Sequence, residues 1–103
     1  MKHVIEHPLG EDVAHTVVER AFDEYKTRYA SYHPSLTWKS KEAADVGFTA
    51  KGVSLRGRIA LRPGAIDVEL DVPLLLRVFQ KRAMEVIDRE VRRWIERARA
   101  GEV

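Results

Sequence analysis

The chain has 103 residues, a formal net charge of +2 and no cysteine. This length predicts a single domain over residues 1–103 that buries roughly 60–70% of the surface its unfolded chain exposes. The lack of cysteine excludes a disulfide framework, a cysteine-based zinc site and a thiol nucleophile. No apolar run approaches the ~18 residues of a membrane span, so a cytoplasmic protein is the default expectation.

The first third of the chain predicts a short strand and an amphipathic helix. The strand covers residues 2–7, and Pro8 and Gly10 end it. Over residues 11–32 apolar side chains recur every three or four positions, which is the spacing of one helix face. His33 should end this helix, because the residue before a proline is disfavoured in the helical region.

Residues 36–72 predict an antiparallel meander of four strands with one dry and one wet face. A short strand over 36–40 comes first, and three longer strands follow in which apolar residues occupy alternate positions. We place the reversals at Lys51-Gly52 and Pro63-Gly64. Gly47 and Gly57 then lie near each other inside adjacent strands, which predicts a curled sheet.

These turns specify a register in which every apolar residue meets another. The predicted apolar pairs are Ala50 with Val53, Phe48 with Leu55, Ile59 with Val68, and Leu61 with Ile66. On the wet face, Arg58 should lie between Asp45 and Glu69. A shift by one residue would turn the apolar set to water, so the register is strongly specified. The charges have an ordinary structural role as cross-strand pairs.

The last element is a long amphipathic helix that follows Pro73 and runs to about Ala100. Asp71 is the expected cap near its start, and Gly101 is the expected stop. The predicted class is therefore α+β: a strand, a helix, a four-stranded antiparallel meander and a long C-terminal helix, with a curled sheet packed on the helices.

Positive charge gathers on this last helix. Residues 74–100 carry eight basic and four acidic side chains, whereas residues 1–33 carry four basic and six acidic ones. An anionic surface such as nucleic acid or lipid headgroups is one candidate partner. The candidate contacts are Arg89, Arg92, Arg93 and Arg97. We favour a solvated helix face with pairs such as Asp88 with Arg92, so a nucleic-acid partner is not expected.

The polar residues match no catalytic or metal-binding motif. His3 and His7 share a strand face but would stand roughly 13 Å apart at ~3.3 Å per residue, too far to ligate one metal ion. The glycines at 47 and 52 resemble a phosphate loop, but Val53 stands where that loop requires lysine. Glu90 is the carboxylate nearest the apolar stripe, and we expect it to reach water. No catalytic residue, metal or cofactor is predicted.

Seven aromatic residues are predicted to project toward the interface between sheet and helices. They are Phe22, Tyr25, Tyr29, Trp38, Phe48, Phe79 and Trp94. They could line an apolar pocket, or they could form the core. We favour the core, because a domain of this length has little apolar surface to spare for a ligand pocket.

Several segments share the pattern of one bacterial family. They are His3–Gly10, Leu36–Trp38, Val53–Gly57, Leu61–Pro73 and Glu90–Ile95. In these segments the chain resembles the putative polyhydroxyalkanoic acid system proteins, which are named for association with polyester storage granules and bring no catalytic residue to carry over. The order of elements also resembles a reduced helix-grip fold of the lipid- and steroid-binding kind. Such domains have more strands and longer chains, so the likeness does not imply a large cavity.

The family resemblance implies a non-enzymatic accessory protein of polyhydroxyalkanoate storage, which binds the granule, an apolar ligand or a granule protein. Two alternatives stay open. A small enzyme acting on a hydroxyacyl substrate predicts a pocket holding a polar group with a perturbed pKa. A binder of nucleic acid or another anionic surface would use the basic C-terminal helix.

Overall fold

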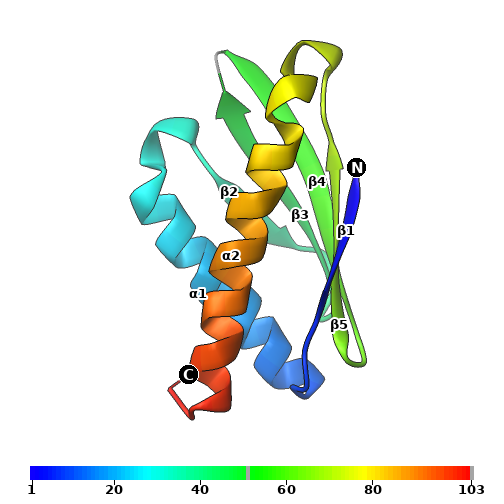
Figure 1. The fold of residues 1–103 in the computed structure, drawn as a ribbon, viewed down its shortest axis with the longest axis vertical. Helices are drawn as coiled ribbons and strands as arrows, with labels where there is room; N and C mark the ends of the chain where they lie inside the picture. Colours follow the sequence, from blue (N-terminus) through cyan, green and yellow to red (C-terminus); the bar gives the residue numbers. More distant parts are fainter. Residues whose placement is uncertain (51, 103) are drawn as a thin grey trace.

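The chain folds into a five-stranded antiparallel sheet with two α-helices on one face (Figure 1). The computed structural model describes residues 1–50 and 52–102, without the side chains of Ala50 and Leu75. Its elements are β1 (Lys2–Glu6), α1 (Glu11–Arg28), η1 (Ala30–Tyr32), β2 (Ser35–Trp38), β3 (Ala43–Ala50), β4 (Val53–Arg62), β5 (Ala65–Asp71), η2 (Leu74–Phe79) and α2 (Gln80–Arg99). The elements η1 and η2 are 3₁₀ helices. The predicted α+β class is confirmed.

The strand order in the sheet is β1-β5-β4-β3-β2, so the N-terminal strand lies beside the last strand of the meander. Ile5 of β1 pairs with Ile66 of β5, and the N-terminal ammonium group donates a hydrogen bond of 2.9 Å to the Leu70 carbonyl oxygen. This pairing joins the N-terminal strand to the meander in one sheet.

The register predicted for the meander is confirmed. All four predicted apolar pairs face each other across β3, β4 and β5. Arg58 lies between Asp45 and Glu69, and its Nη2 donates to Glu69 Oε1 at 3.2 Å. Of the predicted Lys51-Gly52 turn, Lys51 lies outside the described residues.

The core fills the space between the helices and the dry face of the sheet. It is built from α1, α2 and the alternate residues of the strands. Gly57 lies at its tightest point, where a Cβ atom would stand 2.4 Å from the Glu69 carbonyl oxygen and 2.7 Å from Leu70 Cδ2. The glycine is therefore required here by close approach of neighbouring atoms.

The first helix is shorter than predicted. It ends at Arg28, and the chain continues as a 3₁₀ turn over Ala30–Tyr32 instead of a further turn of α-helix. His33 adopts a left-handed conformation with φ of 48°, and its N–H donates to the Ala30 carbonyl at 3.1 Å. The proline restriction thus applies at His33, as predicted, but the α-helix has already ended at Arg28 and the chain passes through 3₁₀ geometry between them.

The second helix begins later than predicted, and the predicted cap is wrong. Asp71 is the last residue of β5, and α2 begins at Gln80 without a side-chain cap. The preceding segment is 3₁₀, with the Leu76 N–H donating to the Pro73 carbonyl at 2.8 Å. In this segment Leu76 is buried and Leu74 is exposed.

The predicted stop at Gly101 is confirmed. Gly101 has φ of +77°, its N–H donates to the Ala98 carbonyl at 3.0 Å, and the Glu102 N–H donates to the Arg97 carbonyl at 2.9 Å. This pair of bonds is the Schellman arrangement that glycine favours at helix ends.

Candidate functional site

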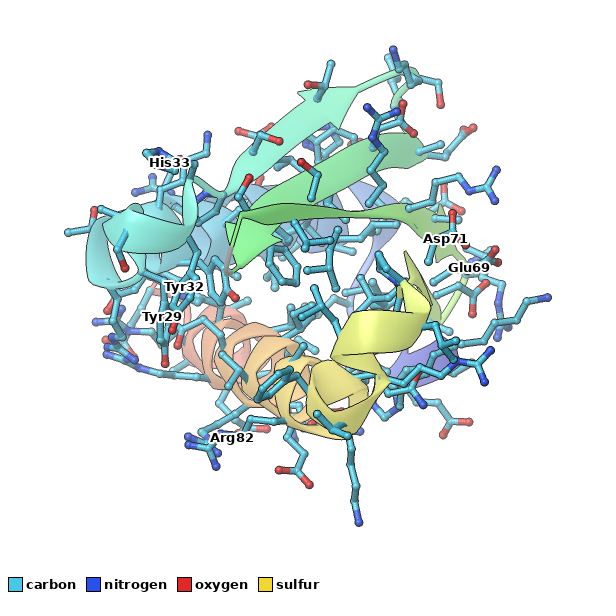
Figure 2. The ribbon with its side chains drawn as sticks, turned by 90° about the horizontal axis from the view of Figure 1, so that it is seen from above. Tyr29, Tyr32, His33, Glu69, Asp71 and Arg82 are labelled. Atoms are coloured by element: carbon cyan, nitrogen blue, oxygen red, sulfur yellow. The ribbon has the colours of Figure 1, made fainter. Side chains whose placement is uncertain are left out.

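An apolar groove opens where α1 and α2 diverge, at the upper end of the molecule in Figure 1. Its volume is about 330 Å³. The lining residues are Tyr25, Tyr29, Tyr32, Phe48, Phe79, Arg82, Ala83 and Val86. Figure 2 shows Tyr29 and Tyr32 on the α1 side and Arg82 on the α2 side. We call this space the aromatic groove.

The three tyrosines of the groove form a ladder along the end of α1. The ring centroids of Tyr25 and Tyr29 lie 4.7 Å apart, and those of Tyr29 and Tyr32 lie 6.3 Å apart. Spacings of four and three residues place these rings on one helix face, although the last ring belongs to η1. Tilted aromatic pairs at such distances stabilise one another beyond their area burial.

Tyr25 is the most buried of the three, with 8% of its surface exposed. Burial, with smaller contributions from the neighbouring Tyr29 and Tyr32, raises the pKa of Tyr25 to about 12. Its hydroxyl forms no hydrogen bond with any of the described residues. The groove therefore contains a neutral hydroxyl donor that has no partner among the described residues and whose oxygen is not fully buried.

Beside the groove, the 3₁₀ helix η2 presents large apolar side chains to solvent. The exposed fractions are 79% for Leu74, 81% for Val78 and 44% for Phe79. We call these three residues the apolar tip. Single exposed hydrophobic residues are ordinary, but several on one short element mark an interaction surface.

Basic side chains without a partner surround the tip. Arg77, Lys81 and Arg82 form no ion pair or hydrogen bond within the described part of the chain. Arg77 belongs to η2, and the other two lie in the first turn of α2. This end of the molecule is thus both apolar and positively charged.

The arginines predicted to contact an anionic surface lie elsewhere on α2, and three of the four are engaged. Arg92 Nε donates to Asp88 Oδ1 at 2.8 Å, which confirms the predicted pair. Arg93 Nη1 lies 3.4 Å from Glu24 Oε1, and the guanidinium of Arg97 lies 4.4 Å from the centroid of the Trp94 ring. Arg89 forms no ion pair among the described residues.

The seven predicted aromatic residues are divided between core and groove. Phe22 and Trp94 are buried in the core, and Trp38 packs at its edge, where it stacks on His15 with centroids 3.8 Å apart. The other four line the groove. They are Tyr25, Tyr29, Phe48 and Phe79.

Two groove residues, Tyr32 and Arg82, were not predicted as site residues. Tyr32 continues the spacing of Tyr25 and Tyr29, and Arg82 follows Phe79 by three positions. These spacings place Tyr32 and Arg82 on the same faces as the predicted aromatic residues. They indicate a groove only once α1 and α2 are known to diverge at this end.

The expectation that Glu90 reaches water is wrong. Only 8% of its side chain is exposed, and its carboxylate pairs with Arg28 at 3.3 Å and Arg93 at 3.7 Å. The reason is tertiary: α1 covers this point of α2 and brings Arg28 across the helix interface. Glu90 therefore acts in holding the two helices together.

A second polar cluster links β1 to α2. His3 Nε2 hydrogen-bonds to Asp88 Oδ2, while Arg92 holds the other carboxylate oxygen. Burial raises the pKa of Asp88, but the hydrogen bonds and positive charges of His3 and Arg92 outweigh burial, so this pKa lies below its ordinary value. Both oxygens of the Asp88 carboxylate are therefore occupied by contacts that link β1 to α2.

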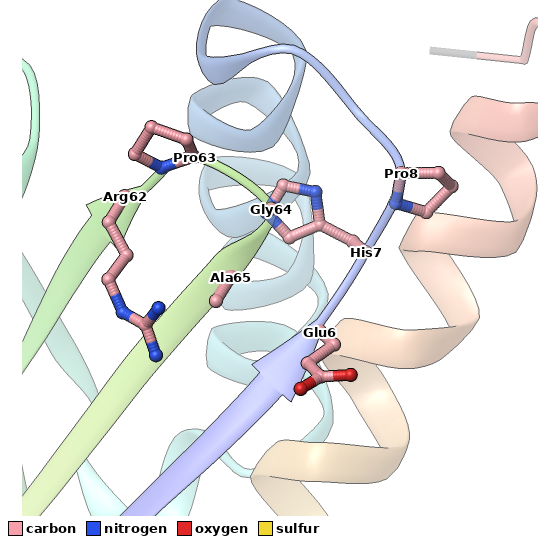
Figure 3. A pocket seen from close by; sticks show the side chains of 7 residues that line it. All are labelled: Glu6, His7, Pro8, Arg62, Pro63, Gly64 and Ala65. Atoms are coloured by element: carbon pink, nitrogen blue, oxygen red, sulfur yellow. The ribbon is translucent and has the colours of Figure 1, made fainter.

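The hollow beside the β4–β5 turn is a weaker candidate (Figure 3). The buried His7 ring borders it, and His7 Nδ1 accepts a hydrogen bond from the Leu9 N–H at 3.1 Å. Arg62, also on its rim, is held by both oxygens of Asp67 at 2.8 and 3.1 Å. Among the described residues, no group of three or more His, Cys, Asp or Glu side chains is placed to hold a metal ion.

A family model described as "Putative polyhydroxyalkanoic acid system protein" matches residues 3–95. The chain belongs to this family. The matched range includes the whole aromatic groove and all of the strands except Lys2, the first residue of β1. The family description names a storage-polymer system and no reaction. Its match confirms the resemblance seen in the sequence.

Searches of curated proteins and of solved structures found no match. The likeness to the helix-grip fold therefore stays a prediction. In the described part of the chain, no helix has the length and apolar character needed to cross a membrane.

Proposed function

We propose that this protein is a non-enzymatic, cytoplasmic accessory protein of polyhydroxyalkanoate storage that attaches to the granule surface through its apolar tip. The observation that carries the proposal is the exposure of Leu74 and Val78, at 79% and 81%, in a family named for the polymer system. Fully burying one such side chain contributes about 1.5–3 kcal/mol. Two of them, with Phe79, supply an apolar contact large enough to hold the protein on a polyester surface.

The position of the tip also favours attachment. The element η2 lies at one end of the long axis of the molecule, away from the core beneath α1 (Figure 1). The tip can therefore enter an apolar phase while the charged wet face of the sheet stays in water.

The groove supports binding over catalysis. A general acid or base works best when its pKa lies near the working pH. In the groove, the group with a shifted pKa is Tyr25, and its shift leads away from neutrality, to about 12. A binding role, in contrast, does not require the Tyr25 hydroxyl to gain or lose a proton near neutral pH.

The alternative of an anionic-surface binder built on the predicted arginines has less support. Arg92, Arg93 and Arg97 already contact Asp88, Glu24 and the Trp94 ring. Engaging them with phosphates would break contacts that the fold uses.

The test is co-sedimentation of the purified protein with bare, amorphous polyhydroxybutyrate granules. The double variant Leu74→Ser/Val78→Ser removes the tip, and Val4→Ser/Val13→Ser is the matched control, because Val4 and Val13 are exposed but lie on β1 and α1. We expect the tip variant to bind at least tenfold more weakly and the control to bind like the parent protein.

Equal sedimentation of the tip variant and the parent would overturn the proposal, provided that thermal unfolding shows both to be folded. Sedimentation of the parent only with protein-coated granules would replace the polymer by a granule protein as the partner.

A further inference from the structure

We propose that the aromatic groove is a binding site for a hydroxyalkanoic acid, with the carboxylate on Arg82 and the hydroxyl or ester oxygen on Tyr25. The ligand is one acyl chain that carries a carboxylate at its end and an oxygen substituent along it. A free acid and the carboxyl end of a polyester chain both have this chemistry.

The first support is the Tyr25 hydroxyl. It belongs to a side chain that is 8% exposed, it lines the groove, and it forms no hydrogen bond among the described residues. The hydroxyl oxygen is not fully buried, so it is accessible from the groove and free of competing protein acceptors among the described residues, and it can donate to an oxygen of a bound ligand. Its pKa of about 12 keeps the hydroxyl protonated, and hence a donor, at neutral pH.

The second support is Arg82 on the opposite wall. Its guanidinium has no ion pair within residues 1–50 and 52–102, although it lies in the first turn of a helix with several acidic residues. A guanidinium offers a planar fork of donors that matches a carboxylate with two parallel hydrogen bonds. Arg82 lines the groove from α2, and Figure 2 shows it at the edge of the molecule on that side; the residue is exposed, so a charged head group held there would remain near water.

The walls between these two groups suit an aliphatic chain. Tyr29, Phe48 and Phe79 supply aromatic faces, and Ala83 and Val86 supply the floor on α2. The volume of about 330 Å³ lies at the lower end of the range of ligand pockets, about 300–1,000 Å³. A single chain of medium length fits this space, whereas a two-tailed lipid does not.

The choice of a hydroxyalkanoate over other hydroxylated acids rests on the proposed function. The site itself does not depend on attachment to the granule, because Tyr25 and Arg82 lie outside the apolar tip. Both groups can therefore be changed without removing Leu74 or Val78.

Calorimetric titration of the full chain with 3-hydroxydecanoate, decanoate and decanol tests the site. We expect the affinity to fall in that order. Arg82→Gln should weaken both acids at least fivefold and leave decanol unchanged. Arg77→Gln is the matched control, since it removes an equally unpaired charge on η2 outside the groove, and it should bind like the parent protein.

Tyr25→Phe keeps the ring and removes only the hydroxyl. It should bind decanoate as the parent does and lose the preference for 3-hydroxydecanoate. A preference that survives in Tyr25→Phe, or equal binding of the acids by Arg82→Gln and Arg77→Gln, would overturn the inference. Absence of heat with 3-hydroxydecanoate at millimolar concentration, with the protein folded, would do the same.

A short oligoester with a free carboxylate separates the two sources of ligand. Tighter binding than the monomer supports the polymer end as the natural ligand, and weaker binding supports the free acid. Co-sedimentation of Arg82→Gln and Tyr25→Phe with granules should stay at the parent level. If the parent protein sediments with granules but does not bind the acid in the groove, this inference alone is overturned. If the tip variant fails to sediment but still binds the acid, the two sites are separate.

Discussion

The two parts of the C-terminal helical segment, residues 74–82 and 84–99, both combine apolar and basic side chains, but the first has no acidic residue and the second has four, and their surroundings differ. In the second part the apolar side chains are buried, as for Val91, and the arginines mostly have partners. In the first part Leu74 and Val78 face solvent, and all three basic side chains lack a partner among the described residues. Composition accounts for part of the difference, because the first part has no acidic residue of its own to pair with its basic ones. The exposure of its apolar side chains depends instead on coverage by neighbouring elements.

The cause of the difference is the divergence of the two helices. Figure 1 shows α1 and α2 crossing in the lower half of the molecule and separating toward the top. The last contact of α1 with α2 through charged groups is the pair Arg28–Glu90. Above it α2 loses its helical neighbour, and the aromatic groove occupies the opening.

The largest expected effect is a loss of stability from a change in residues 84–99, the part of the segment that neighbouring elements cover. Trp94 is buried between α2 and the core, and truncating a buried aromatic residue costs about 3–5 kcal/mol. Trp94→Ala should lower the free energy of unfolding by this amount in urea denaturation. A loss below about 1 kcal/mol would mean that Trp94 is not part of the core and would break the comparison.

The second effect is a loss of stability at alkaline pH, and it concerns Tyr25 of α1, which lines the groove where the two helices separate. Because the pKa of Tyr25 is raised to about 12 from an ordinary value of 10.0, the folded state favours the neutral phenol. The resulting stabilisation is fully present below pH 10 and is lost as pH rises through 12, up to about 2–3 kcal/mol. Spectrophotometric titration should show one tyrosine that ionises last, and Tyr25→Phe should remove that step and flatten the alkaline loss of stability.

The third effect is a loss of stability at acid pH, and it concerns Asp88 in residues 84–99. The lowered pKa of Asp88 means that the folded state favours its carboxylate, so its stabilisation is present above the ordinary pKa of 3.8 and is lost as pH falls through the folded value. Asp88→Asn should lower stability at pH 7 by about 1 kcal/mol and make the fall below pH 4 shallower. Asp23→Asn is the control, because Asp23 is exposed and its carboxylate has no ion pair among the described residues.

The smallest effect is expected at the tip. Val78→Ala removes a side chain that is 81% exposed, so the free energy of unfolding should change by no more than about 0.5 kcal/mol. Thermal unfolding measures this directly. A larger loss would show that the fold holds the Val78 side chain, and it would contradict the role of Val78 as a contact residue.

Strand pairing was the most predictable feature of this protein. Phe48 with Leu55 and Ile59 with Val68 follow from alternation with a period of two, because a slip by one residue would expose the whole apolar set. The helix stop at Gly101 was equally predictable, since glycine adopts the positive φ of +77° without a steric penalty.

The candidate site was only partly predictable. The seven aromatic residues were predicted as one set for core or pocket, with the core favoured, but the structure divides them: Tyr25, Tyr29, Phe48 and Phe79 line the groove, whereas Phe22 and Trp94 belong to the core. Periodicity shows which face of a helix is apolar. It does not show how far along that face a neighbouring helix covers the apolar side chains. This coverage decides which of them lie in the core and which line the groove.

The sequence by itself determined the α+β class, the register of the meander and the end of the last helix, because each depends on local periodicity or on the backbone freedom of one residue. Only the tertiary structure decided that Glu90 is buried against Arg28, that η2 exposes Leu74 and Val78, and that a groove opens beside Arg82. These features depend on the angle at which α1 crosses α2. That angle is fixed by the packing of side chains from distant parts of the chain, and no local pattern encodes it.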